Sequence, residues 1–287
     1  MSYDLFRAEI DDGFPRLERL FEQAKQDFWN DSTAIDWEQP LTLTPDERRA
    51  MAKILSLIYY GERAALEVSA QLVPLVDDEQ AKFVLACQVI EEAKHVSAFR
   101  RLLKKLDDIH PANFWVRRVL ADLVETKHAS YKLVGMQLIV ENIANQLFHI
   151  IHEHIEDPLI RRVLEYVGRD EKKHTGLAVL YLPKILKQVG FVESHMLWAK
   201  QIYWTFCVSQ AIWDHRREAA ALGIDIEVAL KKGIAAQDHL VEQMGIRRGI
   251  FKSQTLEGIV ISMYGRERRK NQRGQWTPHP SRTSSSS

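Results

Sequence analysis

One spacing occurs twice in this sequence, and the repeat limits the folds that the chain can adopt. Glu62 stands thirty residues before the motif Glu92-x-x-His95, and Glu141 stands thirty residues before Glu171-x-x-His174. Residues i and i+3 of a helix share a face, so each motif presents a carboxylate and an imidazole to one point. A helical hairpin that turns midway between the glutamate and the motif would bring all three side chains to the same level along the hairpin axis.

Both midpoints fall in turn-like sequence. The first is Asp77, within Asp77-Asp78, and the second is Glu156, beside Asp157-Pro158. Two antiparallel hairpins packed as a four-helix bundle would bring together four carboxylates and two imidazoles, a set that binds two metal ions in helical bundles. The sequence therefore predicts an all-α protein with a four-helix bundle core. The predicted ligands of its dinuclear metal site are Glu62, Glu92, His95, Glu141, Glu171 and His174.

The residues around the predicted ligands are apolar, as an inward-facing site requires. Leu55 and Ile58 precede Glu62 on its helical face, and Leu138 precedes Glu141. Burying four carboxylates costs several kcal/mol per charge unless cations compensate them. A single Glu-x-x-His pair would be an ordinary solvated helix face, but the doubled spacing favours the metal site. Glu91 is not at i, i+3 with the histidine, and we expect it to face solvent or a neighbouring helix.

Composition indicates an ordinary globular chain. The 287 residues are 46% hydrophobic and 27% charged, with a net charge of zero. This balance argues against a nucleic-acid-binding surface. The sequence also contains no run of about eighteen apolar residues, the length needed to span a membrane. The first residues lack a secretory signal, so we expect a cytoplasmic protein. We expect one domain over residues 1–264 and a flexible polar tail over 265–287, which is Ser-rich at its end.

Helices are expected along almost the whole chain. The clearest start signal is Thr44-Pro45-Asp46-Glu47, with a capping threonine, proline at the first helical position and glutamate two residues later. Gly190, Gly223 and Gly245 are expected stops. The predicted helices cover about 12–29, 45–75, 78–106, 112–127, 130–155, 158–188, 192–222 and 225–244.

Beyond this pattern, the sequence resembles the ribonucleotide reductase small-subunit superfamily. The resemblance rests on Phe28-Trp29, Ile35-Asp36-Trp37, Leu43-Thr44-x-Asp46-Glu47-Arg48 and the motifs around the six predicted ligands. It covers about residues 25–190, and the branch it resembles most is that of the ligand-binding oxidases, which carry a manganese/iron site and a long-chain fatty acid. The resemblance implies a ferritin-like fold with additional helices, and we expect a homodimer.

Three positions depart from the family pattern. Phe99 stands where reductase subunits place a radical-bearing tyrosine, four residues after the first ligand histidine. Ala64 and Met136 stand where the ligand-binding oxidases form a tyrosine–valine crosslink, which cannot form here. We therefore predict that Ala64, Phe99 and Met136 line an apolar substrate channel beside the metals.

Four further residues are candidates for contacts outside the ligand set. By resemblance, Asp170 would hold the first ligand histidine and Trp29 would continue a radical path, although Trp29 is equally expected as a packing residue. Gln88 and Gln137 each lie one turn before a ligand glutamate, where they would hydrogen-bond it or act as ordinary polar core residues.

Several other features have simpler interpretations. We assign His149, His152 and His154 to a solvated helix end, with adventitious metal binding as the alternative. The aromatic stretch from Trp198 to Trp213 indicates core or dimer packing. Cys87 and Cys207 are expected to be packed thiols.

Carboxylate and imidazole ligands suit iron and manganese, so the expected cofactor is two metal ions, Fe/Fe or Mn/Fe. We predict an O₂-activating oxidase or oxygenase acting on an apolar organic substrate, with a long-chain lipid as one candidate. The alternatives are a ribonucleotide reductase small subunit that lacks the usual tyrosine, and a metal storage protein. The sequence does not identify the reductant.

Overall fold

The computed structural model describes residues 15–244, and within them it contains helices and no strands. The expected tail, the helix stop at Gly245 and the first residues of the predicted helix 12–29 lie outside the described residues. The prediction of an all-α chain is confirmed for the described part.

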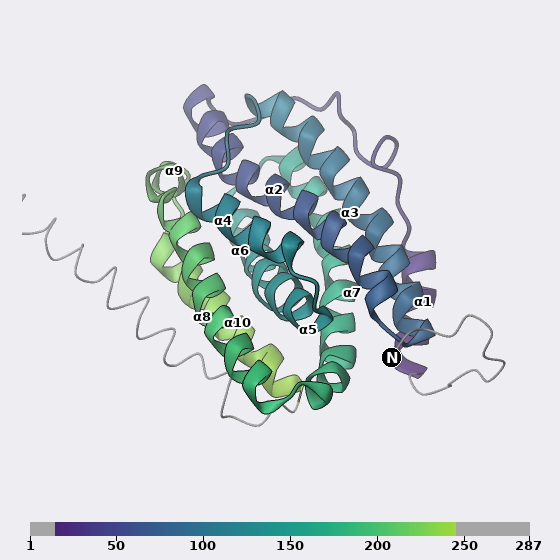
Figure 1. Ribbon diagram of the computed structural model, residues 1–287. Coiled ribbons are helices and arrows are strands. Elements are labelled where there is room, and N and C mark those ends of the chain that lie inside the picture. Colours follow the sequence, from purple (N-terminus) through teal and green to yellow (C-terminus); the bar gives the residue numbers. More distant parts are fainter. Residues whose placement is uncertain (1–14, 245–287) are drawn as a thin grey trace, which may run out of the picture.

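Four long helical units form the core (Figure 1). They are α2 (Pro45–Leu75), α3 (Glu79–Leu106), the continuous unit η1 (Leu133–Glu141) and α6 (Asn142–His154), and α7 (Pro158–Gln188). Helix α2 packs against α3, α3 against α7, α7 against η1 and α6, and η1 against α2. The four units therefore close into the predicted bundle.

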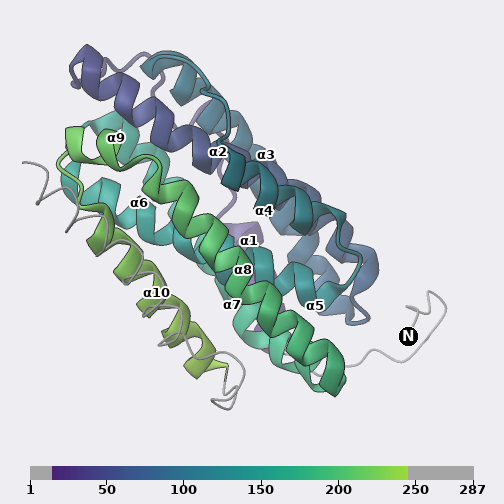
Figure 2. The ribbon, with the colours of Figure 1, turned by 60° about the vertical axis from the view of Figure 1, so that its left-hand side comes forward.

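The remaining helices cover this core (Figures 1 and 2). Helix α1 (Pro15–Gln26) lies against α3 and α7, and α4 (Phe114–Glu125) lies between α2 and α8 (Phe191–Trp213). The short α5 (Ala129–Lys132) leads into η1. Helix α9 (Arg216–Ala221) contacts α2, and α10 (Ile226–Gln243) contacts α6.

Local capping fixes where the long helices begin. Thr44 and Glu47 form a reciprocal capping box ahead of Pro45, as predicted: the Thr44 backbone N–H donates to the Glu47 carboxylate at 2.8 Å. Asp157 caps α7 and also accepts from the backbone and hydroxyl of Thr42, at 2.6 and 3.0 Å. Asp157 thereby ties the entry of α2 to the entry of α7. The expected turns at Asp77 and Glu156 are both present.

Two predicted helices differ from the structure. Residues 130–155 were expected to form one α-helix, but Leu133–Glu141 is a π-helix, in which each N–H bonds to the fifth preceding carbonyl. The predicted helix 192–222 is broken after Trp213. At this break the Asn113 amide donates to the Ala211 carbonyl, and Arg216 donates to the Trp213 carbonyl, so side chains satisfy carbonyls at the helix end.

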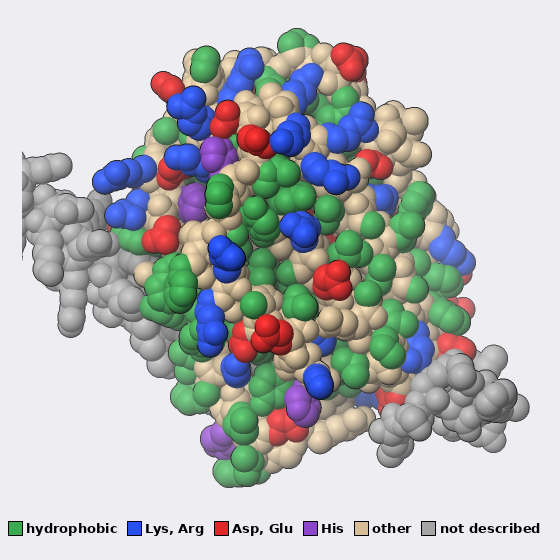
Figure 3. All heavy atoms as spheres, turned by 45° about the horizontal axis from the view of Figure 1, so that its top comes forward, with side chains coloured by type: hydrophobic (Ala, Val, Ile, Leu, Met, Phe, Trp, Pro, Cys, Tyr) green, Lys and Arg blue, Asp and Glu red, His purple; other side chains and the backbone are tan. Residues whose placement is uncertain are grey.

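The surface carries acidic and basic side chains interspersed over the face shown in Figure 3, in keeping with the balanced charge. Among the described helices, none is long and apolar enough to cross a membrane.

Candidate metal centre

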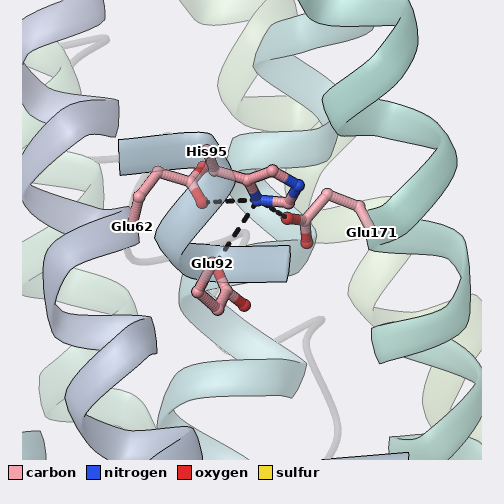
Figure 4. A group of neighbouring side chains, drawn as sticks. All are labelled: Glu62, Glu92, His95 and Glu171. Carbon is pink, nitrogen blue, oxygen red and sulfur yellow. Dashed lines mark hydrogen bonds and ion pairs between the residues drawn. The ribbon is translucent and has the colours of Figure 1, made fainter. Parts of the chain in front are cut away.

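All six predicted ligands meet in the middle of the bundle, and all six are buried. Their donor atoms form two groups, within each of which every atom lies within 4.8 Å of the others. Figure 4 shows the first group, with the carboxylates directed at the Nδ1 atom of His95. The first group is Glu62, Glu92, His95 and Glu171, and the second is Glu92, Glu141 and His174.

Two glutamates lie between the two histidines. Glu92 places Oε2 at 3.5 Å from His95 Nδ1 and Oε1 at 3.3 Å from His174 Nδ1. Glu171 does the same, with Oε1 at 3.3 Å from His95 and Oε2 at 3.4 Å from His174. Glu62 contacts only the His95 side, at 3.0 Å. This arrangement suits two bridging carboxylates, with one histidine and one further glutamate at each end.

Burial strongly affects the pKa values of Glu62 and Glu141. Removal from water, followed by the charges of Glu171 and Glu92, raises the pKa of Glu141 well above its ordinary value. The pKa of Glu62 is likewise raised by burial, although the adjacent His95 opposes the shift. Burying these carboxylates as charged groups is therefore costly unless cations compensate them.

The pKa values of the two histidines and of Glu171 shift in the direction opposite to the one that burial alone would give. Burial alone would lower the pKa of His95, but Glu62 and the other carboxylates around it hold that pKa well above 6.5. The pKa of His174 is raised in the same way by Glu171 and Glu92. Burial would raise the pKa of Glu171, but both histidines outweigh it and lower this pKa to about 2. The carboxylates around the two imidazoles therefore favour positive charge at the centre of the site.

Several donor atoms of the site lack hydrogen-bond partners. Within the described residues, Glu92, Glu141 and Glu171 each have a buried Oε2 without a hydrogen bond, and so does Nδ1 of His174. Buried polar atoms normally have partners. These oxygens and this nitrogen belong to the donor types that iron and manganese bind, so the residues present fit a dinuclear centre.

Gln88 and Gln137 form a polar chain beside the ligands. The Gln88 amide donates to Glu92 Oε1 and to Glu141 Oε1, both at 3.1 Å. Its oxygen accepts from the Gln137 amide at 3.0 Å. Gln88 thus contacts two candidate ligands directly, whereas Gln137 acts on them only through Gln88.

Asp170 holds the outer nitrogen of His95, as the resemblance implied. His95 donates from Nε2 to Asp170 Oδ2 at 3.2 Å, and Trp29 donates to the same oxygen at 2.7 Å. Lys94 also contacts this oxygen, and Lys173 contacts the other. Burial opposes ionisation of Asp170, but His95 and the two lysines outweigh it and hold its pKa far below the ordinary range. Trp29 stacks on Tyr166 with ring centroids 4.8 Å apart.

Glu91 plays the matching role for the second histidine, which the sequence analysis did not foresee. Of the two expected positions, solvent and a neighbouring helix, Glu91 takes the second: it lies buried against helix α7, where it accepts from His174 Nε2 at 2.9 Å. Lys173, only 2% exposed, lies 2.7 Å from Glu91 and 2.7 Å from Asp170. The available signal was a second repeat around the motifs: each Glu-x-x-His follows an acidic residue and has lysine before its histidine.

An apolar cavity of about 70 Å³ adjoins the site between α2, α4, η1, α6 and α8. Of the three residues predicted to line a substrate channel, Met136 lines this cavity, whereas Ala64 and Phe99 do not. The neighbouring Ala65 lines the cavity instead, while Ala64 faces an open groove between α2 and α4. Phe99 is buried and stacks on Phe148 at 6.0 Å. The candidate ligands that reach the cavity are Glu62, Glu141 and Glu171.

The clustered histidines of α6 and the aromatic residues of α8 are not among the candidate ligands. His154 donates to the Ile150 carbonyl at the end of α6, and His152 lies 3.6 Å from Glu165, so neither belongs to a metal group within the described residues. Trp204 is fully buried and packs in the core, whereas Trp198 is exposed. Cys87 and Cys207 are free thiols, as expected.

Comparison with known proteins confirms the expected fold. No family model and no curated protein matches the sequence. Among solved structures, a variant of an R2-like ligand-binding oxidase with an Mn/Fe cofactor matches with a TM-score of 0.64 and 16% identity over 81% of this chain and 95% of that chain. Another variant, with an Fe/Fe cofactor, matches with a TM-score of 0.64 and 16% identity, over 81% and 94%. The chain therefore has the ferritin-like fold of these oxidases.

Proposed function

We propose that this protein is an O₂-activating dinuclear metal enzyme, an oxidase or oxygenase that acts on an apolar organic substrate. The observation that carries the proposal is that three of the six candidate ligands also line an apolar cavity. A substrate group in that cavity would lie directly against the metal centre. Enzyme sites commonly combine such an apolar pocket with a few polar groups.

The ligand set favours Fe/Fe or Mn/Fe, because hard carboxylates with imidazole suit these metals. When bound, the two ions would supply the electrons that reduce O₂ and the oxidising power that acts on the substrate. The Mn/Fe and Fe/Fe cofactors of the structurally similar oxidases support this choice. Glu62, Glu92, His95 and Glu171 would hold one ion, and Glu92, Glu141 and His174 would hold the other.

The surrounding residues orient the site. Asp170 and Glu91 each accept from the Nε2 atom of a histidine, which leaves Nδ1 of that ring directed at the carboxylates. Gln88 fixes one oxygen of Glu92 and one of Glu141. The side chains of Met136, Ile58 and Leu147 make the cavity apolar, so it excludes water and selects an apolar group. Within this proposal, a long-chain lipid is one candidate substrate and a homodimer is the expected assembly.

The alternatives receive less support. A reductase subunit of the usual kind would use an oxidisable residue one turn after His95, but that position is Phe99, packed against Phe148, so this alternative is limited to a subunit that lacks the usual tyrosine. A storage protein has no need of an apolar cavity at its metal ligands.

Two adjacent alanines provide the test. Ala65→Phe should fill the cavity, whereas Ala64→Phe should extend into the open groove and serve as the matched control. After loading with iron and manganese, both variants should keep the wild-type metal content by elemental analysis. Ala65→Phe should lose O₂ consumption coupled to substrate, together with any co-purified apolar ligand seen by mass spectrometry. If Ala65→Phe retains both, the substrate does not use this cavity.

A further inference from the structure

A second pocket lies between α6 and α7 and belongs to no part of the proposed metal centre. Its volume is about 280 Å³, and it opens to solvent beside the exposed His149. Helix α6 contributes Asn145, Phe148, His149 and His152, and helix α7 contributes Leu164, Glu165, Gly168, Arg169 and Lys172.

Gly168 leaves open space in the wall of this pocket. A Cβ atom added to this glycine would meet nothing within 4 Å, so the missing side chain leaves open space on the face of α7. Phe148 and Leu164 form an apolar base, and the polar groups stand around it. A bound molecule would therefore contact polar groups on both helices at once.

The polar groups are mostly hydrogen-bond donors. Arg169 and Lys172 lie one turn apart on α7, and the Asn145 amide and the His149 imidazole lie opposite them on α6. Arg169 is held in place, because its Nη2 donates to the Asp27 carbonyl at 2.9 Å and its guanidinium lies over the Tyr166 ring. Within the part of the chain that the structure describes, Lys172 and His149 have no ion-pair or hydrogen-bond partner.

One carboxylate, Glu165, lines the pocket, and it is paired with a cationic side chain. Glu165 lies 3.4 Å from Arg162 and 3.6 Å from His152. The charges of Arg169 and Lys172 remain available to a bound anion, since the Asp27 group that Arg169 contacts is a neutral carbonyl. An anion of about two negative charges would match them, and a phosphate monoester carries about this charge at neutral pH.

We propose that this pocket binds a phosphate group, either as free phosphate or as a small phosphate monoester. Guanidinium and ammonium groups are the usual partners of phosphate oxygens, and the amide and imidazole donors on the facing helix would take the remaining oxygens. The volume leaves room for an organic substituent beside the phosphate. The proposal stands independently of the metal centre and its chemistry.

Two variants test the proposal by different physical routes. Lys172→Ala removes one of the two charges from an exposed position, and Gly168→Met fills the pocket without changing the charge. Lys187→Ala, an exposed lysine near the end of the same helix, is the control. Binding of inorganic phosphate and of glycerol 3-phosphate to the full chain would be measured by isothermal titration calorimetry at fixed ionic strength, with circular dichroism to verify the fold.

We expect saturable binding at one site per chain for at least one of the two probes. Lys172→Ala should weaken it about tenfold, the equivalent of one lost charge-assisted contact, and Gly168→Met should abolish it, while Lys187→Ala should bind as the wild type does. Tighter binding of glycerol 3-phosphate would identify the ligand as a monoester, and binding of inorganic phosphate alone would identify it as free phosphate. Absence of saturable binding by both probes, or binding that survives in both pocket variants, would overturn the proposal.

Discussion

Glu91 and Asp170 show how single residues complete the site around the candidate ligands. Each immediately precedes a candidate ligand glutamate, and each accepts from the histidine of the opposite motif. Lys173 contacts both carboxylates and so links the two halves of the arrangement. The two motifs are therefore related by contacts outside the ligand set as well as by spacing.

This pairing predicts the effect of Glu91→Gln. The variant should weaken metal binding at the His174 position by roughly 10–100-fold, as loss of an outer partner of a ligand histidine typically does. Anaerobic titration with Mn²⁺ would measure both positions. The His95 position should change much less, and Glu91→Asp should restore part of the affinity. Glu67→Gln, at an exposed position on α2, is the control. Equal affinity in wild type and Glu91→Gln would show that His174 does not depend on this contact.

At the scale of elements, η1 is the feature that most affects the site, because it carries Met136, Gln137 and Glu141. Gly135 sits within it where the chain packs closely: an added Cβ would collide with Leu123 and would lie 3.0 Å from Trp204. Gly168 on α7 has the opposite surroundings, with open space at the same point.

These two glycines should respond oppositely to the same substitution. Gly135→Ala should destabilise the protein by about 1–3 kcal/mol, since overpacking forces neighbours to move. Gly168→Ala should stabilise it by roughly 0.5–1 kcal/mol, because alanine restricts the unfolded chain and favours the helix. Chemical denaturation would give both values. A stabilising Gly135→Ala would mean that Leu123 and Trp204 are not packed as described.

The contact between α4 and α8 should give stability a dependence on pH. Asp122 accepts from Lys200 at 2.7 Å and from Trp204 at 2.6 Å. Burial raises the pKa of Asp122, but these hydrogen bonds outweigh it and leave the pKa below 3.8. A carboxyl with a lowered folded-state pKa stabilises the protein above its unfolded pKa of about 3.9, and the contribution is lost as the pH falls below that value.

Asp122→Asn should therefore cost about 1 kcal/mol at neutral pH, a value reduced for the partial exposure of Lys200. The difference between variant and wild type should shrink as the pH falls from about 4 through the lowered folded-state pKa of Asp122, below which the wild-type carboxyl is neutral in both states. Urea unfolding across this pH range would measure it. A difference that stays constant with pH would show that the ion pair contributes nothing and that only shape was changed.

At the scale of the whole molecule, the bundle places four carboxylates and two imidazoles in its centre, and all of them are buried. Such a site is costly to assemble without cations. The fold should therefore be markedly more stable when the metals are bound than when they are absent.

Metal removal tests this coupling. Each ion present at a hundred times its dissociation constant should stabilise the native state by about 2.7 kcal/mol, which calorimetry would detect as a higher unfolding temperature. In His95→Ala the increase should be smaller, and at least one metal position should be empty by elemental analysis. The exposed His195→Ala should behave as the wild type does. Full occupancy of both positions in His95→Ala would contradict the ligand assignment.

The sequence by itself determined the bundle, its hairpin turns and the six residues that meet at its centre. This was possible because the helical period fixes which residues share a face, and the doubled thirty-residue spacing fixes their heights. The start of α2 was equally predictable, since Thr44 and Glu47 form a capping box within the same short segment and Pro45 stands at the first helical position.

Tertiary structure alone decided the remaining features of the site. The π-helix could not be foreseen, because its residues are buried nearly all round and show no amphipathic period. Ala65 rather than Ala64 lines the cavity because neighbouring residues on a helix point about 100° apart, and helix packing sets which of them faces inward. The contact between Glu91 and His174 depends on the packing of α3 against α7. A buried carboxylate needs a hydrogen-bond donor, and the facing helix supplies this one.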